Sequence, residues 1–320
     1  MLPSYNVKKW EGRYILIYVL GDESYRNLIK TNALRFVPDF LLPHFKPKII
    51  ENINTNEEVV IGKIVGINIK PINFLDKKQW DLFIEGIIKV KTVEDTKIYI
   101  EDFIKYPVDY LNKIECNTSL KFRSGDNIRI SNIPLIIEKI YKSLGKGYNL
   151  TDTLIISDNK QKAIDTIKLL TDKINFFTVI GLDPLSKDEL YEEILDCTGV
   201  SIFQPNNVDK IIKNYGTIIN YNNKVDFEKG NVRNESVIID FSIEKPFKVL
   251  ESTNKRIIYV GEINFELNIS NNWIGKFGSA ELIECIDGYD NMEFSQIYTN
   301  NDFYFIDDFI KSEIKKRGRI

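Results

Sequence analysis

The sequence predicts an α/β protein in which a doubly wound parallel sheet is joined to a second α/β lobe. Two observations lead to this fold class. From residue 150 to residue 267, short apolar segments alternate with segments of helical spacing, which is typical of a parallel sheet covered on both faces. A chain of 320 residues, 43% of them hydrophobic, is also long enough to bury two cores. We therefore expect one lobe at residues 1–145, completed by helices at 268–320, and the sheet domain at 146–267.

The N-terminal lobe mixes strand and helix patterns. "RYILIYVLG" and "EEVVIGKIVGINI" read as strands, and the segment "NALRFVPDFLLPHFKPKIIEN" between them is interrupted by prolines and predicts a loop with short helical pieces. Apolar residues from Trp80 to Ile88 recur at helical spacing and predict a helix. A further helix, "NIPLIIEKIYKSLG", with Pro134 in its first turn and Gly145 at its end, is predicted to link the two lobes.

In the second lobe the strands and helices follow one another regularly. The predicted strands are "TLIIS", "FFTVIG", "VSIFQ", "GTIINY", "SVIIDFS" and "RIIYVG". The predicted helices between the first four are "NKQKAIDTIKLLTDKI", "KDELYEEILDC" and "NVDKIIKNY". From "NWIGKFGSAELIECIDG" to the end we expect helices that pack on the N-terminal lobe.

The turn "SDNKQKA" follows the first of these strands, where a dinucleotide-binding unit has glycines. Glycine permits the tight turn and the close approach of a pyrophosphate, and the helix that follows offers free N–H groups. Asp158 as an N-cap, with Gln161 completing a capping box, explains the segment without a ligand. Alternatively, lysines near the helix start bind the phosphates of NAD or NADP. The candidate cofactor residues are Ser157, Asp158, Asn159, Lys160, Asp183 and Tyr221.

Two of these candidates lie outside the turn. Asp183 ends the second strand segment roughly 20 residues after the turn, where an acidic residue binds the ribose hydroxyls of NAD. The alternative is that "LDPLSKDEL" is a turn and a cap, with Ser186 or Asp188 capping the next helix. Tyr221 follows the fourth strand, at the expected switch point of the sheet.

A polar cluster between two apolar segments, "FRSGDN", is the candidate substrate site. It contributes Arg123, Ser124, Asp126 and Asn127. The alternative is a solvated turn. No residue pattern identifies a catalytic group.

Composition limits the other classes of function. A net charge of −3 with interspersed signs does not favour binding to nucleic acid or to an anionic membrane, and the basic "KSEIKKRGRI" reads as a helix end. No apolar run approaches the roughly 20 residues of a membrane span, and no signal-peptide core is present, so a cytoplasmic location is expected. Three scattered cysteines predict no disulfide framework, and no metal site is expected. The single histidine, His44, reads as structural.

The order of segments resembles the long-chain acyl-carrier-protein reductases and the predicted amino-acid dehydrogenases related to them, whose nucleotide-binding lobe is of the Rossmann type found in shikimate dehydrogenase. The segments that carry the resemblance are "YILIYVLGD", "FVPDFLLPHFKPKII", "VVIGKIVGINI", "LKFRSGDNIRIS", "ILDCTGVSI" and "GSAELIECIDG". The family implies a nicotinamide cofactor and a cysteine before Ala-Glu that attacks a thioester. Here Gly278 stands at that cysteine's position, and Cys285 lies further along the same helix.

Two functions follow from these patterns, and both remain open. The first is an NAD(P)-dependent oxidoreductase that acts on a small-molecule or acyl/carbonyl substrate with a degenerate cofactor turn. The second is a non-catalytic pseudo-dehydrogenase, a module that binds a small molecule or a protein partner. In the second, "QIYTNNDFYFIDDFI" contributes a contact with a partner protein or a homodimer contact, and the alternative is core packing. A methyltransferase or a sugar-nucleotide enzyme on a related fold is a third class.

Overall fold

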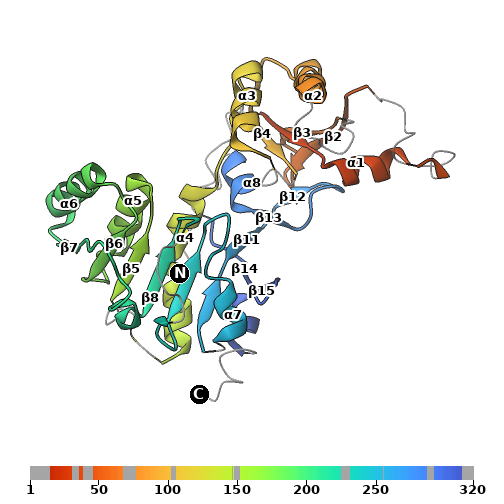
Figure 1. Cartoon of the computed structure of the whole chain (residues 1–320). Coiled ribbons are helices and arrows are strands. Elements are labelled where there is room, and N and C mark those ends of the chain that lie inside the picture. The colour runs from red at the N-terminus through yellow and green to blue at the C-terminus, as the bar shows by residue number, and fades with distance from the viewer. Residues whose placement is uncertain are drawn as a thin grey trace. The chain divides into compact units, whose positions relative to one another are not determined.

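The computed structural model describes residues 15–30, 36–38, 46–67, 77–101, 106–145, 147, 152–224, 231–254, 256–286 and 292–311. His44 and the basic tail from residue 312 lie outside these ranges. The chain forms two compact units, Met1–Gly125 with Leu267–Asp290 and Asp126–Glu266 with Asn291–Ile320 (Figure 1). By this division the linking helix and residues 291–320 belong to the second unit, and residues 267–290 belong to the first.

The first unit contains a mixed sheet whose described strands have the order β12-β2-β3-β1-β4. These strands are β1 (Ile15–Val19), β2 (Lys48–Thr55), β3 (Val60–Gly66), β4 (Asp95–Ile100) and β12 (Ile269–Ser270). Strand β1 runs parallel to β3 and β4, and β2 is antiparallel to β3. The prediction of a loop up to Asn52 is wrong, because "KIIENINT" pairs with β3 along the whole length of β2.

Helices α1 (Asp22–Ile29), α2 (Lys77–Val90), α3 (Val108–Thr118) and α8 (Ala280–Cys285) belong to the same unit. The predicted helix at Trp80 is confirmed. Its apolar face packs on the sheet, and Trp80 stacks on Tyr110 of α3 with ring centroids 4.3 Å apart. Ile88 is half exposed and does not share this face.

Helix α4 (Asp126–Ser143) begins earlier than predicted. Pro134 lies in its interior, although proline removes a backbone donor and is expected only in a first turn. Burial of Ile133, Ile136 and Ile140 on one face compensates for the lost hydrogen bond. The residues "DNIRIS", which precede the predicted helix, are therefore helical as well.

The second unit contains a parallel sheet whose described strands have the order β10-β9-β8-β5-β6-β7. The strands are β5 (Thr153–Ile156), β6 (Phe177–Ile180), β7 (Ile202–Phe203), β8 (Thr217–Asn220), β9 (Val237–Asp240) and β10 (Ile258–Val260). Numbered along the chain, this is the order 3-2-1-4-5-6 of a Rossmann sheet. The predicted fold class and all six predicted strands are confirmed.

Helices α4, α5 (Lys160–Leu170) and α6 (Pro184–Thr198) pack side by side, and Figure 1 shows α5 and α6 together beside β5, β6 and β7. The other face is covered by loops and by the short helix α7 (Val249–Thr253), which bury a cluster that includes Leu154, Ile218 and Phe247.

The helix predicted at residues 207–215 is wrong. Within the described residues, this connection from β7 to β8 contains one 3₁₀ turn, η5 (Ile212–Asn214). Val208, Ile212 and Tyr215 have helical spacing and are buried, but a turn followed by a single 3₁₀ turn is enough to bury side chains over so short a segment.

The prediction of helices up to the C-terminus is wrong for residues 296–305. Strands β14 (Gln296–Thr299) and β15 (Asp302–Phe305) form an antiparallel hairpin, and β11 (Glu262–Glu266) pairs with β14. The short helix α9 (Ile306–Phe309) follows. Asn300 and Asn301 have φ angles of 49° and 65°, which suit the tight hairpin turns that asparagine tolerates.

Candidate functional site

The carboxyl ends of β5 and β8 form the switch point of the sheet, because the chain leaves these neighbouring strands toward opposite sides. Ser157 and Tyr221 follow the two strands directly. The amide of Ser157 donates to the carbonyl of Ile180, and the amide of Tyr221 donates to the carbonyl of Ile156. The structure therefore brings these two predicted residues to one edge of the sheet.

The turn between β5 and α5 has the length of a G-x-G-x-x-G turn. Counted from the end of β5, the three glycine positions are occupied by Ser157, Asn159 and Lys162. The hydroxyl of Ser157 donates to the carbonyl of Asn159 at 2.8 Å and accepts from the amide of Asn159 at 3.0 Å. The side chain of Ser157 thus stabilises the turn through two local hydrogen bonds.

The N-cap of α5 is Asn159, not Asp158 as predicted. The Oδ1 atom of Asn159 accepts from the amide of Lys162 at 3.1 Å, while Asp158 is exposed. Gln161 does not complete a capping box, because its side-chain amide donates to the carboxylate of Asp165. One amide that a bound phosphate would use at a helix N-terminus is therefore occupied by a side chain of the chain itself.

The two lysines near this turn have acidic partners. Lys160 binds Glu189 of α6, and this hydrogen bond raises the pKa of Lys160 above its usual value. Lys162 lies 2.9 Å from the carboxylate of Asp126, and its ammonium is 5.7 Å from the centre of the Tyr221 ring. Both positive charges are thus already paired.

Asp183 caps helix α6, so the turn-and-cap interpretation of "LDPLSKDEL" is confirmed, although the capping residue is neither Ser186 nor Asp188. Its Oδ1 atom accepts from the amides of Leu185 and Ser186, and its Oδ2 atom accepts from the hydroxyl of Ser186. These hydrogen bonds, the hydroxyl's first, hold the pKa of Asp183 below its usual value.

Tyr221 is buried, and its hydroxyl pairs with the hydroxyl of Thr166 in α5 at 2.7 Å. Burial raises the pKa of Tyr221. The hydroxyl of Tyr221 therefore has its hydrogen-bond partner within the second unit, on α5.

A buried polar network that was not predicted lies at the ends of β8 and β9. The Nδ2 atom of Asn220 donates to Asp240 at 2.8 Å, and the hydroxyl of Ser242 donates to the same carboxylate at 2.6 Å. The amide of Phe247 donates to its other oxygen. The signal in the sequence was a polar residue at the end of each apolar strand, "TIIN" and "VIID".

The predicted substrate residues do not behave as one cluster. Arg123, Ser124 and Asn127 are exposed, whereas Asp126 begins α4 and binds Lys162. The amide of Gly125, which has a φ of 74°, donates to Glu284 at 2.6 Å. Through Lys162, Asp126 contacts the predicted cofactor turn.

No thiol stands at the position that the resemblance gives to a nucleophile. Gly278 lies in β13 (Phe277–Ser279), directly before α8. Cys285 is buried at the end of α8, and burial raises the pKa of its thiol to about 12. A protonated, enclosed thiol is a poor nucleophile.

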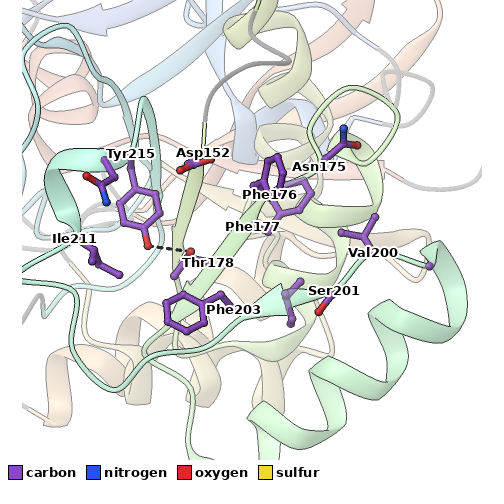
Figure 2. Close-up of a pocket in the computed structure, with 13 residues that line it drawn as sticks. Asp152, Asn175, Phe176, Phe177, Thr178, Val200, Ser201, Phe203, Ile211 and Tyr215 are labelled. Atoms are coloured by element: carbon purple, nitrogen blue, oxygen red, sulfur yellow. Dashed lines mark hydrogen bonds between the residues drawn. The ribbon is translucent and has the colours of Figure 1, made fainter.

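A cavity of about 770 Å³ lies at the other edge of the same sheet, at the amino ends of β5, β6, β7 and β8. Figure 2 shows its lining residues, among them Asp152, Phe176, Phe203 and Tyr215. The sequence offered no motif for it.

The described residues offer neither a metal site nor a membrane-spanning helix. Among the described residues, no group of three His, Cys, Asp or Glu side chains is arranged to hold a metal ion. Across the same residues, no helix combines the length and apolar character that a bilayer crossing requires.

No protein-family model matches the sequence, and no curated protein is significantly similar to it. Among solved structures, the chain resembles L-tryptophan dehydrogenase from Nostoc punctiforme, at 11% identity over 86% of this chain and 74% of that chain, with a TM-score of 0.39. It also resembles quinate dehydrogenase from Corynebacterium glutamicum in complex with NAD, at 8% identity over 77% and 87%, with a TM-score of 0.36.

A third similar structure is Delta(1)-pyrroline-2-carboxylate reductase from Thermococcus litoralis in complex with NADH and L-proline. The identity is 14% over 37% of this chain, the TM-score is 0.30, and the match spans only 36% of the reductase. Similarity at these levels concerns the fold alone, and no residue of this chain takes a role from it.

Proposed function

We propose that the protein is an NAD(P)-dependent-oxidoreductase-like Rossmann protein with a degenerate cofactor site, which serves as a binding or assembly module rather than as a dehydrogenase. One observation carries this proposal. At the three glycine positions of the cofactor turn, Ser157, Asn159 and Lys162 have side chains that form internal bonds.

A pyrophosphate in the usual pose would have to displace these bonds. It needs free amides at the start of α5, but the side chain of Asn159 already accepts from the amide of Lys162. The lysines that could bind the phosphates in place of the glycine turn, Lys160 and Lys162, are paired with Glu189 and Asp126. The exposed carboxylate of Asp158 adds a negative charge beside the same helix end.

The ribose side of a nicotinamide cofactor meets a similar obstacle. Both carboxylate oxygens of Asp183 accept hydrogen bonds from the first turn of α6. Binding ribose hydroxyls there competes with the cap that begins the helix.

Thioester chemistry of the acyl-carrier-protein reductase type is also disfavoured. Gly278 offers no nucleophile, and the thiol of Cys285 is buried with a raised pKa. If the chain acts on an acyl or carbonyl substrate, the reaction uses groups other than Gly278 and Cys285.

A working NAD(P)-dependent oxidoreductase is the second candidate. The complete strand order and the helix that begins at the switch point favour it, since this is the arrangement in which dinucleotides bind. Its substrate would be a small carbonyl or acyl compound, with the exposed Arg123, Ser124 and Asn127 as the predicted substrate residues.

Calorimetric titration of the full chain with NADH and with NADPH separates the two candidates. We expect no saturable heat at cofactor concentrations up to about 1 mM. The variant Asn159→Gly, which frees the amide of Lys162 and restores glycine at the second position, is the matched test of the turn. We expect Asn159→Gly to bind NADH or NADPH more tightly than the unaltered chain does. Saturable binding of either cofactor to the unaltered chain overturns the proposal.

The assembly role has its own measurement. Native mass spectrometry of the purified chain is expected to show a retained small molecule, a co-purifying protein or a homodimer. A bare monomer with none of these removes the reason for proposing a binding or assembly module.

A further inference from the structure

The cavity at the amino edge of the Rossmann sheet lies on the side opposite to the cofactor turn. Its lining residues come immediately before, or at the start of, β5, β6, β7 and β8, whereas the turn and Tyr221 follow the ends of β5 and β8. Its volume of about 770 Å³ falls within the roughly 300–1,000 Å³ of ligand pockets. All of its lining residues belong to the second unit.

The cavity exists because one face of the sheet is incompletely covered. The register places Leu154, Thr178 and Phe203 in one row across β5, β6 and β7, so these side chains share a face. Leu154 is fully buried under the loops, but the row ends at Phe203, which is 57% exposed. A helix between β7 and β8 would cover this end of the sheet, and the single 3₁₀ turn η5 does not.

Four aromatic residues contribute to the wall of the cavity, namely Phe176, Phe177, Phe203 and Tyr215. Phe176, which is 69% exposed, and Phe203 present their rings to solvent at its sides (Figure 2). Tyr215 forms the opposite wall, and its hydroxyl donates to the hydroxyl of Thr178 at 2.9 Å. Exposed aromatic surface around a hollow is a feature of ligand and partner sites.

The charge among the side chains that line the cavity is negative. Of the described residues that line it, only Asp152 carries a full charge, and Asp152 is exposed. Burial raises the pKa of Tyr215, and the negative charge of Asp152 raises it further, so the field of this carboxylate reaches the wall of the cavity. An anionic ligand would meet this carboxylate with no lining cation to offset it.

We propose that this cavity is a binding site for a small organic cation, a compound with a flat apolar body and one ammonium group. The apolar body would cover the rings of Phe176 and Phe203, and the ammonium would lie near Asp152 and the Tyr215 ring. Aromatic rings attract cations through their faces, and a carboxylate adds to this attraction. The proposal does not depend on the state of the cofactor turn, because the two sites share no residue.

Three probes of one size and different charge test the proposal, namely benzylamine, benzyl alcohol and benzoate. Each is titrated into the full chain, and binding is followed by ligand-observed NMR. We expect saturable binding that is tightest for benzylamine and weakest for benzoate. Equal affinity for all three probes, or tightest binding of benzoate, overturns the proposal.

Two variants and two matched controls locate the binding. Asp152→Asn and Phe203→Ser are each expected to weaken benzylamine binding by roughly fivefold, as expected for a partly exposed ion pair or ring contact. Asp188→Asn makes the same change of charge on α6, and Leu185→Ser removes an exposed apolar side chain there. Both controls are expected to leave the affinity unchanged.

All four residues are exposed, so the substitutions are expected to leave the fold intact, which a thermal melt of each variant checks. If the controls weaken binding as much as Asp152→Asn and Phe203→Ser do, benzylamine is bound elsewhere on the acidic chain and the proposed site is wrong.

Discussion

The ammonium of Lys162 lies 2.9 Å from the carboxylate of Asp126, which ties the first turn of α5 to the first turn of α4. In a dinucleotide-binding turn this third position is a glycine, whose absent side chain lets the helix approach the strand. Here the position carries a long side chain that also covers the ring of Tyr221. The position that corresponds to this glycine thus forms a contact between two helices.

This ion pair is expected to contribute modestly to stability. Both side chains keep about a quarter of their surface exposed, so solvent weakens the attraction. In a double-mutant cycle of Lys162→Met and Asp126→Asn, we expect a coupling energy of about 0.5–1 kcal/mol, measured by urea unfolding. Strict additivity of the two substitutions would show that the pair does not form in solution.

Gly181 should be far less tolerant of a side chain than Gly199. Both have positive φ angles, but a Cβ on Gly181 would lie 2.7 Å from the carbonyl oxygen of Ser157, and a Cβ on Gly199 meets nothing within 4 Å. We expect Gly181→Ala to lower the free energy of unfolding by about 2–4 kcal/mol and Gly199→Ala by about 1 kcal/mol. Equal losses would mean that the backbone at Gly181 can move away.

The three cysteines should differ in reactivity. Cys116 and Cys197 are exposed, whereas Cys285 is buried and has a pKa raised to about 12. With a thiol reagent at mildly alkaline pH, we expect two thiols to react in the native chain and the third only after denaturation. Mass spectrometry of the labelled peptides identifies the sites, and rapid labelling of Cys285 would contradict its burial.

The cap of α6 should make stability depend on pH in the acid range. Because the pKa of Asp183 is lower in the folded chain than its usual 3.8, the carboxylate stabilises the fold fully above that usual value. This contribution is lost as the pH falls through the lower folded value. We expect Asp183→Ala to unfold more easily than the unaltered chain at neutral pH, with the difference vanishing at strongly acidic pH.

Urea unfolding at a series of pH values checks this prediction. Asp188→Ala, an exposed acid on the same helix, is the control. A difference between Asp183→Ala and the unaltered chain that is independent of pH would show that the charge of the cap is unimportant.

The sequence was sufficient for the elements whose apolar residues follow one period. The six strands of the Rossmann sheet and helices α2, α5 and α6 were predicted, because each buries a continuous row of apolar side chains. Local rules failed where tertiary packing outweighed them. Pro134 lies inside α4, the hairpin at Asn300 was predicted as helix, and the helix predicted at residues 207–215 is replaced by a turn and the 3₁₀ turn η5 (Ile212–Asn214).

For the candidate sites, the sequence alone determined which residues stand near the cofactor edge and that glycine is missing there. Only the tertiary structure decided what those residues do, because each partner is remote in sequence or depends on backbone geometry. Lys160 meets Glu189 and Lys162 meets Asp126, and both pairs form only once the helices pack. The cavity at the amino edge also depends on the tertiary structure. It forms because the connection from β7 to β8 leaves one end of the sheet uncovered, and no sequence pattern indicates such a gap.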